Sequence, residues 1–576
     1  MTTTGAENDR NGSQGASMER REFMAFFAAL GLGGTAFPAL LWRRMQQQAG
    51  PITKEMISAC ENIAGLEFTD AEREMMVQGL NQTLEGYKAL RTIELPNSVF
   101  PAISFDPVLP GRELPRETRP FRYSRPSRVE RPADLEELAF WPVTHLAELV
   151  RRRRVRSVEL TEMYLDRLKR HGPTLECVVT LTEDLAMEQA RRADEEIARG
   201  RYRGPLHGIP WGAKDLLAED CCRTTWGAKP YENQVINQDA TVVRKLEEAG
   251  AVLVAKLTLG ALAMGDVWFG GRTRNPWNLE QGSSGSSAGS AAATVAGLVA
   301  FSIGSETLGS IVSPSTRCGA TGLRPTFGRV SRHGAMALSW TMDKLGPICR
   351  SAEDCAIVFN HIHGADGLDP TARTLPFNWD PERKISELRI GILESAFNSD
   401  YETREFDQQA LEVLRRLGAR FIPVELPDQY PVQALRIILN AEAAAAFDDL
   451  TRSNRDDLLV RQDPGAWPNS FRRSRFIPAV EYIQANRVRT LLMEAMERTM
   501  AGIDVLVSPT FGGNQLLITN LTGHPAVVVP NGFRENGTPV SITFIGKLFG
   551  EAEALAVAKA YQDATDFHLR RPPAFS

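Results

Sequence analysis

The sequence predicts a layered α/β domain, and the observation that carries this prediction is an alternation of helical and strand patterns. A helical pattern over residues 184–199 ends at Gly200, and a second over 239–250 leads directly into an apolar strand pattern at 251–257. Residues 177–181 form another short apolar strand pattern. A glycine after a helical pattern is a common stop signal, and such alternation is typical of layered α/β domains. The hydrophobic fraction of 43% and the charged fraction of 24% are those of a soluble globular protein.

Residues 1–42 are predicted to be a leader. The first 19 residues are polar and expected to be disordered, and Arg20, Arg21 and Phe23 then precede an uncharged apolar stretch that ends at Trp42. Paired arginines before such a stretch are similar to a twin-arginine export signal, with the twin-arginine export machinery as a partner. About 20 apolar residues are also just long enough to span a bilayer. Residues 23–42 are therefore compatible with either a cleaved signal or a membrane anchor. Both place the protein outside the cytoplasm, in the periplasm or anchored facing it.

Residues 43–97 are expected to form a helical hairpin segment. Thr69 and Asp70 precede Ala71, Glu72 and an apolar periodicity, which predicts a capped amphipathic helix starting near Ala71.

Residues 98–137 are predicted to be a linker, because prolines exclude long helices and central strands. These are Pro101, Pro107, Pro110, Pro115, Pro120, Pro126 and Pro132.

The main domain is expected to span 138–572. Its first helices are predicted to run to about Arg154 and over 158–170, with Thr144 and Ser157 as N-caps.

The main domain is organised around residues 282–325, in which two Gly/Ser-rich turns bracket a buried apolar segment. The turns read Ser284-Gly-Ser-Ser-Ala-Gly-Ser290 and Gly304-Ser-Glu-Thr-Leu-Gly-Ser310. A flexible linker would lack the apolar segment at 291–303. Small residues, several hydroxyls and turn amides aimed at one spot suit a nucleophile in an oxyanion hole, with a base supplied from elsewhere.

These two turns, followed by Gly322-Leu-Arg-Pro-Thr326, resemble the signature of the amidase signature family. A second segment, Gly204-Pro-Leu-His-Gly-Ile-Pro-Trp-Gly-Ala-Lys214-Asp215, resembles the family's lysine motif. Further family-like segments extend the resemblance from about Trp141 to Tyr561. The resemblance implies the amidase signature fold, in which a mixed, mostly parallel β-sheet is covered by helices on both faces.

By this resemblance the catalytic residues are Ser310 as nucleophile, Ser286 as bridging hydroxyl and Lys214 as base. A cis peptide bond is expected between Gly285 and Ser286. The backbone amides of four residues are expected to form the oxyanion hole: Thr307, Leu308, Gly309 and Ser310. The implied reaction converts a carboxylic amide to an acid plus ammonia or an amine through an acyl-enzyme, without a cofactor or a metal.

The sequence departs from the family pattern at three positions in the second turn. Glu306 replaces the usual Asp, Leu308 replaces a Gly, and Val312 stands where an Arg usually follows the nucleophile. Leu308 is expected to narrow the acyl pocket if its side chain faces inward, and loss of the Arg disfavours an anionic substrate. Only residues 511–519 separate Thr510 from Asn520, where relatives carry a longer loop, so we expect a more open pocket.

Two other kinds of site receive less support. His207 and His524 lie in motif segments, but a Ser/His/Asp site lacks its G-x-S-x-G elbow and an ordered acidic partner. The seven cysteines show no metal-ligand spacing and no disulfide framework, although the adjacent Cys221 and Cys222 leave a redox role open.

The leading functional hypothesis is an exported amidase acting on a small-molecule amide. The first alternative is the glutaminase-type subunit of a tRNA-dependent amidotransferase, because residues 52–97 loosely resemble the small C subunit of that enzyme. Those residues then either bind a partner or pack on the main domain. The second alternative is a non-catalytic binding homologue. A net charge of −5 gives no reason to expect a nucleic-acid partner, and the sequence leaves a monomer and a homodimer open.

Overall fold

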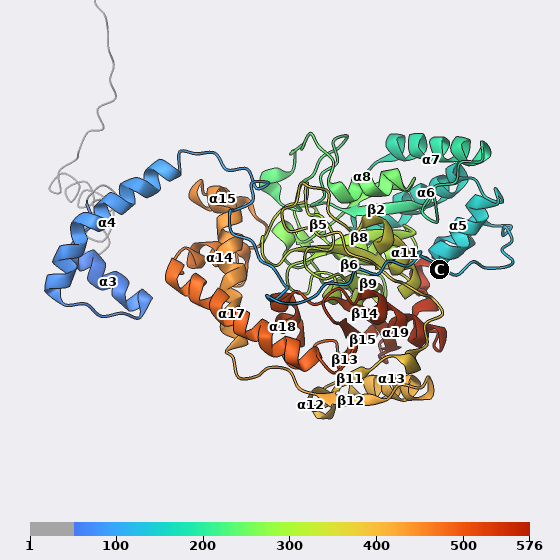
Figure 1. The fold of residues 1–576 in the computed structure, drawn as a ribbon. Coiled ribbons are helices and arrows are strands. Elements are labelled where there is room, and N and C mark those ends of the chain that lie inside the picture. The colour runs from blue at the N-terminus through green and yellow to red at the C-terminus, as the bar shows by residue number, and fades with distance from the viewer. Residues whose placement is uncertain (1–50) are drawn as a thin grey trace, which may run out of the picture. The chain divides into compact units, whose positions relative to one another are not determined.

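The structure, a computed structural model, describes residues 51–576 and divides into two compact units, Met1–Leu95 and Pro96–Ser576 (Figure 1). The predicted export signal and anchor lie outside the described residues. No helix within 51–576 combines the length and the apolar character that a membrane crossing needs.

The described part of the first unit consists of two helices, α3 (Lys54–Ala64) and α4 (Asp70–Leu90). The predicted helix start is confirmed. Thr69 is the N-cap of α4, and Glu72 completes a capping box by accepting the Thr69 N–H at 2.6 Å. These reciprocal bonds satisfy backbone donors that the first helical turn cannot pair internally.

The second unit begins with an extended strap, which we define as residues 96–133. The strap contains no helix or strand. Several hydrogen bonds attach it to the rest of the unit, among them those of Asn97 with Ala337, Arg119 with Asn378, and Ser124 with Glu353. The prolines exclude regular structure in this segment. The backbone N–H groups of Arg119 and Ser124 donate instead to side chains far away in the chain.

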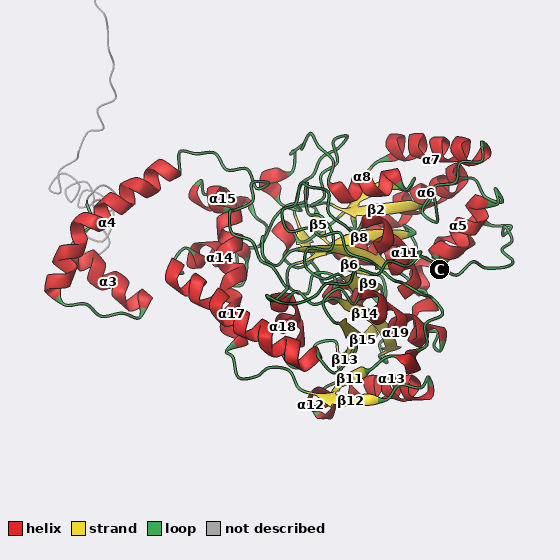
Figure 2. Cartoon of the chain, in the orientation of Figure 1, coloured by secondary structure: helices red, strands yellow, loops and turns green. Residues whose placement is uncertain are grey.

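The core of the second unit is an 11-stranded sheet with strand order β1-β3-β2-β8-β10-β9-β14-β15-β13-β11-β12. Figure 2 shows these strands inside the unit, surrounded by helices. The strands are β1 (Val178–Leu181), β2 (Pro210–Lys214), β3 (Val252–Leu257), β8 (Phe301–Glu306), β9 (Thr321–Arg324), β10 (Lys344–Cys349), β11 (Ile390–Leu393), β12 (Phe421–Val424), β13 (Val505–Pro509), β14 (Ala526–Phe533) and β15 (Pro539–Gly546). Two small ribbons lie apart from it: β4 (Val267–Trp268) with β5 (Gly271–Arg272), and β6 (Arg274–Asn275) with β7 (Asn278–Gly282).

The sheet is mixed, as expected, but it contains fewer parallel pairs than the term mostly parallel implies. The parallel pairs are β2–β3, β2–β8, β11–β12 and β11–β13, whereas the other neighbours in the large sheet are antiparallel. Strands β14 and β15 are joined by only a short turn, and a short connection forces neighbouring strands to run antiparallel.

Helices cover both faces of the sheet, which confirms the predicted α/β fold. Leu253 belongs to one buried cluster and its neighbours Val252 and Val254 to another, so alternate side chains of β3 are buried on opposite faces. The helices are α5 (Val143–Arg151), α6 (Ser157–Leu175), α7 (Glu183–Ala198), α8 (Thr241–Glu248), α9 (Ala288–Val295), α10 (Val312–Cys318), α11 (Ala352–Ile362), α12 (Glu394–Asn398), α13 (Arg404–Arg416), α14 (Ile437–Ala446), α15 (Asp448–Arg452), α16 (Trp467–Ser474), α17 (Ala479–Met500), α18 (Gln515–Thr522) and α19 (Glu551–Asp563).

The two N-caps predicted for the first helices of this unit are wrong. Helix α5 begins at Val143, so Thr144 lies within its first turn. Ser157 is the first residue of α6, and the backbone N–H groups of Ser157 and Val158 donate to Asp194 at 2.7 and 3.1 Å. A carboxylate from a neighbouring helix therefore does the capping, which a local sequence pattern does not reveal.

Candidate active site

The candidate site is built around Lys214, the last residue of β2. Its Nζ donates hydrogen bonds to three serine hydroxyls: Ser286 at 2.8 Å, Ser287 at 3.0 Å and Ser305 at 2.8 Å. Strand β2 runs parallel to its neighbour β8, so the lysine at its carboxyl end lies beside the turn that follows β8. The sheet topology therefore brings together two motifs that lie about 70 or more residues apart.

The environment of Lys214 favours its neutral form. The side chain is fully buried, and burial lowers its pKa well below the ordinary value of 10.5, although the charges of Asp343 and Glu306 act in the opposite direction. No carboxylate within 51–576 forms an ion pair with its Nζ. A neutral lysine amine in contact with a hydroxyl can accept that hydroxyl's proton.

The first serine turn holds the expected cis peptide bond between Gly285 and Ser286, and this expectation is confirmed. The chain here passes close to a neighbouring segment, since a Cβ at Gly285 would lie 1.9 Å from the Gly265 carbonyl oxygen. Ser286 is almost fully buried. The next residue, Ser287, donates its N–H to the Ser310 carbonyl at 3.1 Å, which joins the first turn to the second.

The second serine turn leaves β8 and reaches Ser310 through Gly309, whose φ of 83° is a conformation that favours glycine. Ser310 is mostly buried, with 9% of its surface exposed. Within residues 51–576, the N–H groups of four consecutive residues donate to no protein acceptor: Thr307, Leu308, Gly309 and Ser310. Such free amides are available to an oxyanion that forms next to them.

Glu306 anchors the segment just after Ser310. One carboxylate oxygen accepts the N–H groups of Ile311 and Val312 at 2.8 and 3.0 Å. The other accepts from Arg324 at 2.9 Å and from the Asn520 side chain at 2.8 Å. Burial opposes ionisation, but the charges of Arg324 and Lys344 and the Val312 N–H lower the pKa of Glu306 to about 2. The departure from Asp thus places an ionised carboxylate beneath the turn.

Asp343 holds the same turn from its other end. Thr307 donates its hydroxyl to Asp343 at 2.5 Å, and the N–H groups of Leu338 and Ser339 donate to the second oxygen at 2.8 and 2.9 Å. Burial raises the pKa of this carboxyl, whereas the Thr307 hydroxyl and the Arg332 charge favour ionisation. Asp343 therefore links the serine turn to the loop around Leu338.

The other two departures have separate structural consequences. Leu308 is partly buried and packs against an apolar cluster that contains Met342 and Leu517. Val312 is fully buried at the start of α10, so this position offers the site no charge.

Some residues of the site were not singled out from the sequence. Ser287 and Ser305 each contact Lys214. The two serines also contact each other, because the backbone N–H of Ser305 donates to Ser287 Oγ at 3.1 Å. Both serines lie inside the two Gly/Ser turns, so the sequence pattern includes them. The alignment of the turns with the family motif did not show which of their hydroxyls face the lysine. Asp343 lies outside the two turns and is joined to them only by folding.

The two histidines considered above do not join the site. His207 is buried beyond the opposite end of β2, where its ring stacks on Tyr202 with centroids 5.9 Å apart. His524 shares a hydrogen bond of 2.8 Å with Thr522, and burial lowers its pKa to about 3. Both are accounted for by packing.

Cys221 and Cys222 form no disulfide, and they neighbour the carboxylates of Glu219, Asp220 and Asp239, which lie within 4.8 Å of one another. Glu219 is buried and Asp220 is exposed, and acidic groups commonly lie close together without binding a metal.

Comparison with known proteins gives consistent results. The family model described as Amidase matches residues 159–519. The A subunit of glutamyl-tRNA(Gln) amidotransferase from Carboxydothermus hydrogenoformans is 34% identical over 486 residues, which cover 76% of this chain and 99% of that protein. The corresponding protein of Heliobacterium modesticaldum is 36% identical over 478 residues, covering 74% and 97%.

Among solved structures, the native peptide amidase from Stenotrophomonas maltophilia superimposes with a TM-score of 0.68 at 31% identity. The match covers 77% of this chain and all of that one.

Proposed function

Because this chain belongs to the amidase family, whose members are hydrolases of amide C–N bonds, we propose that it cleaves a carboxylic amide through Ser310, Ser286 and Lys214. The observation that carries the proposal is the contact between the buried Lys214 amine and the Ser286 hydroxyl at 2.8 Å. A base needs both proximity and the neutral form, and burial favours the neutral form.

In the proposed mechanism Lys214 takes the proton of Ser286, and Ser286 takes the proton of Ser310 as its Oγ attacks the carbonyl carbon. The free amides from Thr307 to Ser310 stabilise the negative oxygen of the tetrahedral intermediate. The C–N bond then breaks as the proton returns through Ser286 to the departing nitrogen. Water hydrolyses the resulting ester of Ser310 by the same proton route and releases the acid.

We propose a neutral amide as the substrate of a free-standing enzyme. The charged side chains that contact the second serine turn are already bound to protein groups: Glu306 to Arg324, and Asp343 to Thr307. A free amino acid amide such as glutamine brings an ammonium and a carboxylate, each of which needs a partner when desolvated. The chain also matches the solved peptide amidase over the whole length of that enzyme.

The second candidate is the ammonia-producing component of an amidotransferase. What favours it is the similarity to the A subunit of the glutamyl-tRNA(Gln) enzymes, which extends over 99% of the Carboxydothermus protein. In that setting the same acyl-enzyme chemistry would release ammonia from glutamine for use by a partner protein.

One experiment separates these candidates. Ammonia release would be measured from glutamine, acetamide, benzamide and an amidated dipeptide, with the protein alone. Preference for the neutral amides supports the free-standing amidase, and preference for glutamine supports the amidotransferase component. If no amide is turned over and a fluorophosphonate does not label Ser310, the result supports the hypothesis of a non-catalytic homologue.

We also propose that the chain is exported through the twin-arginine machinery, on the strength of Arg20, Arg21 and the uncharged stretch after them. Export would separate the enzyme from charged tRNA and so favours the free-standing amidase. Fractionation of cells that express the wild type and the double variant Arg20→Lys, Arg21→Lys tests this proposal. Equal distribution of both proteins in the cytoplasm would overturn it.

A further inference from the structure

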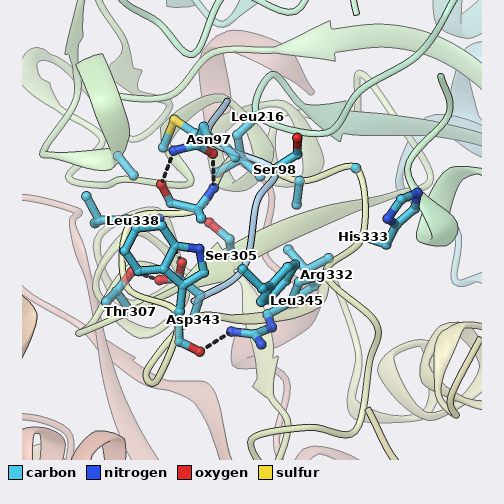
Figure 3. A pocket seen from close by; sticks show the side chains of 17 residues that line it. Asn97, Ser98, Leu216, Ser305, Thr307, Arg332, His333, Leu338, Asp343 and Leu345 are labelled. Atoms are coloured by element: carbon cyan, nitrogen blue, oxygen red, sulfur yellow. Dashed lines mark hydrogen bonds between the residues drawn. The ribbon is translucent and has the colours of Figure 1, made fainter. Parts of the chain in front are cut away.

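A pocket lies directly beside the serine turns, and part of its wall comes from the strap. Figure 3 shows Ser305 and Thr307 at this pocket together with Asn97 and Ser98. Ser305 contacts Lys214, and Thr307 begins the row of free amides. The pocket wall therefore includes direct neighbours of the proposed base and of the oxyanion amides, while Asn97 and Ser98 lie outside the 159–519 segment that matches the family.

The strap is latched at this pocket by a paired amide contact. Asn97 Oδ1 accepts the N–H of Ala337 at 2.7 Å, and Asn97 Nδ2 donates to the Ala337 carbonyl at 2.9 Å (Figure 3). The Asn97 side chain thus pairs with both the N–H and the carbonyl of Ala337, which lies 240 residues away in sequence. Because this side chain provides both bonds, a side chain without an amide group loses at least one of them.

A second contact fixes the strap next to the latch. The ring of Phe100 lies 5.4 Å from the Arg332 guanidinium carbon, and Phe327 lies 4.9 Å from the same carbon. Arg332 is held by Asp369 at 2.9 Å and donates to the Trp340 carbonyl at 2.7 Å. The strap therefore packs against a cation that is held by an ion pair, and both Arg332 and its acceptor Trp340 are part of the pocket wall.

The latch is connected to the second serine turn. Ala337 precedes Leu338 and Ser339, whose N–H groups donate to Asp343, and Asp343 accepts the Thr307 hydroxyl. A shift of the loop after release of Asn97 would move the donors that hold Asp343. The strap is thus coupled to the turn through three successive hydrogen-bonded contacts: Asn97 with Ala337, the 338–339 amides with Asp343, and Asp343 with Thr307.

The pocket has the chemistry of a site for an apolar group that carries a hydrogen-bond acceptor. Its wall contains Leu216, Met336, Leu338, Trp340 and Leu345. The Trp340 indole N–H is buried and has no hydrogen-bond partner within residues 51–576. A buried donor without a partner is costly, and an acceptor on a bound molecule would satisfy it.

We propose that Asn97 is a specificity-determining and positioning residue, which closes the pocket for the group next to the scissile amide. This inference rests on the proposed amidase function. The inference gives the strap, which lies outside the segment that matches the family, a part in the choice of substrate. The strap would then set the size of the group that the pocket accepts, while the serine turns carry out the chemistry.

The experiment compares Asn97→Ala with wild type on two substrate series. One series varies the acyl group: acetamide, butyramide and phenylacetamide. The other varies the leaving group: acetamide and acetanilide. We expect a change of about tenfold in the ratio of kcat/KM for the largest and smallest members of one series, since pocket contacts of one or a few groups discriminate by such factors.

Three further variants make the result specific. Asn97→Asp keeps the acceptor for the Ala337 N–H but loses the donor, and it should give an intermediate ratio. Phe100→Ala removes the second strap contact and should change the ratio in the same series. Asn378→Ala is the control, because it removes the strap's attachment at Arg119 and Glu117 but contributes nothing to the pocket.

The outcomes are distinguishable. An unchanged ratio in both series for an active Asn97→Ala enzyme, or an equal change in Asn378→Ala, would overturn the assignment of Asn97. Wild-type protein without amide turnover and without fluorophosphonate labelling of Ser310 would instead overturn the proposed function. A uniform loss of kcat on all substrates with unchanged ratios would mean that the strap only stabilises the fold, and it too would overturn the proposal.

Discussion

Glu306 and Arg324 form an ion pair of 2.9 Å in which both side chains are fully buried, directly beneath the turn that carries Ser310. The carboxylate also accepts the N–H groups of Ile311 and Val312. The pair therefore connects the sheet to the two residues that follow the proposed nucleophile. Its role is to position the turn, since within residues 51–576 no hydrogen bond joins Glu306 to Lys214, Ser286 or the Ser310 hydroxyl.

Replacing Glu306 by Ala should lower both stability and activity. Removing one partner of a buried ion pair leaves an uncompensated charge, which typically costs about 3–5 kcal/mol in the free energy of unfolding. We expect chemical denaturation to show a loss of this size and kcat to fall with little change in KM. The control is Glu306→Asp, which keeps the charge and should lose less of both. Equal stability of wild type and Glu306→Ala would contradict this account.

The same carboxylate predicts an acid-sensitive fold. Its pKa is lowered from the ordinary 4.5 to about 2, so the folded protein releases this proton more readily than the unfolded chain does. The stability that Glu306 contributes is thus present above pH 4.5 and is lost as the pH falls towards 2. Denaturation curves of wild type and Glu306→Gln between pH 2 and pH 6 should converge at the acid end.

The proposed triad predicts a large loss of rate when Ser310 or Lys214 is replaced. Ser310→Ala and Lys214→Met should each reduce kcat by at least about a thousandfold, as in other enzymes whose nucleophile and base act as a unit. Ammonia release measures the rate. Ser290→Ala is a matched control, because Ser290 is a buried serine of the same motif whose hydroxyl donates to the Ile303 carbonyl rather than contacting Lys214. Wild-type rates in Ser310→Ala would exclude it as the nucleophile.

The burial of Lys214 predicts the form of the pH–rate profile. Activity needs the neutral amine, so kcat/KM should rise with pH through a pKa well below 10.5. The unfolded chain holds its lysine proton up to about 10.5, so this residue also makes the fold more stable as the pH rises through that interval. The measurement is kcat/KM together with unfolding free energy from pH 5 to pH 10, with Lys214→Met as reference. A rise in rate that begins only near pH 10.5 would argue against this base.

Leu308 should influence the range of substrates more than the mechanism. Its side chain packs on the cluster around Met342 and Leu517 rather than standing free in the site. Leu308→Gly would remove that packing, at a cost of about 1–3 kcal/mol for a partly buried leucine, and enlarge the space beside the oxyanion amides. Rates on phenylacetamide should rise relative to acetamide, and thermal unfolding should occur at a lower temperature.

The sequence by itself determined the chemistry-bearing segments of this protein. The Gly/Ser turns and the lysine motif could be recognised because they depend on residue types at fixed local spacing, and the cis bond at Ser286 was implied by the family resemblance that these segments carry. The α/β character followed for the same reason, since helix and strand periodicity is local. The N-caps at Thr144 and Ser157 failed because the first N–H group of each helix donates to a carboxylate of another helix, Asp354 for α5 and Asp194 for α6.

Only the tertiary structure decided which of these groups meet. Strand order places β2 next to β8, and this brings Ser287 and Ser305 onto Lys214. The bond from Asn520 to Glu306 joins residues 214 positions apart, and the latch of Asn97 on Ala337 joins residues 240 positions apart. Contacts at such separations depend on how the whole sheet is ordered and on which backbone groups remain unpaired after folding. A local pattern contains no information about either, so the site's support and its pocket wall emerge only in the folded chain.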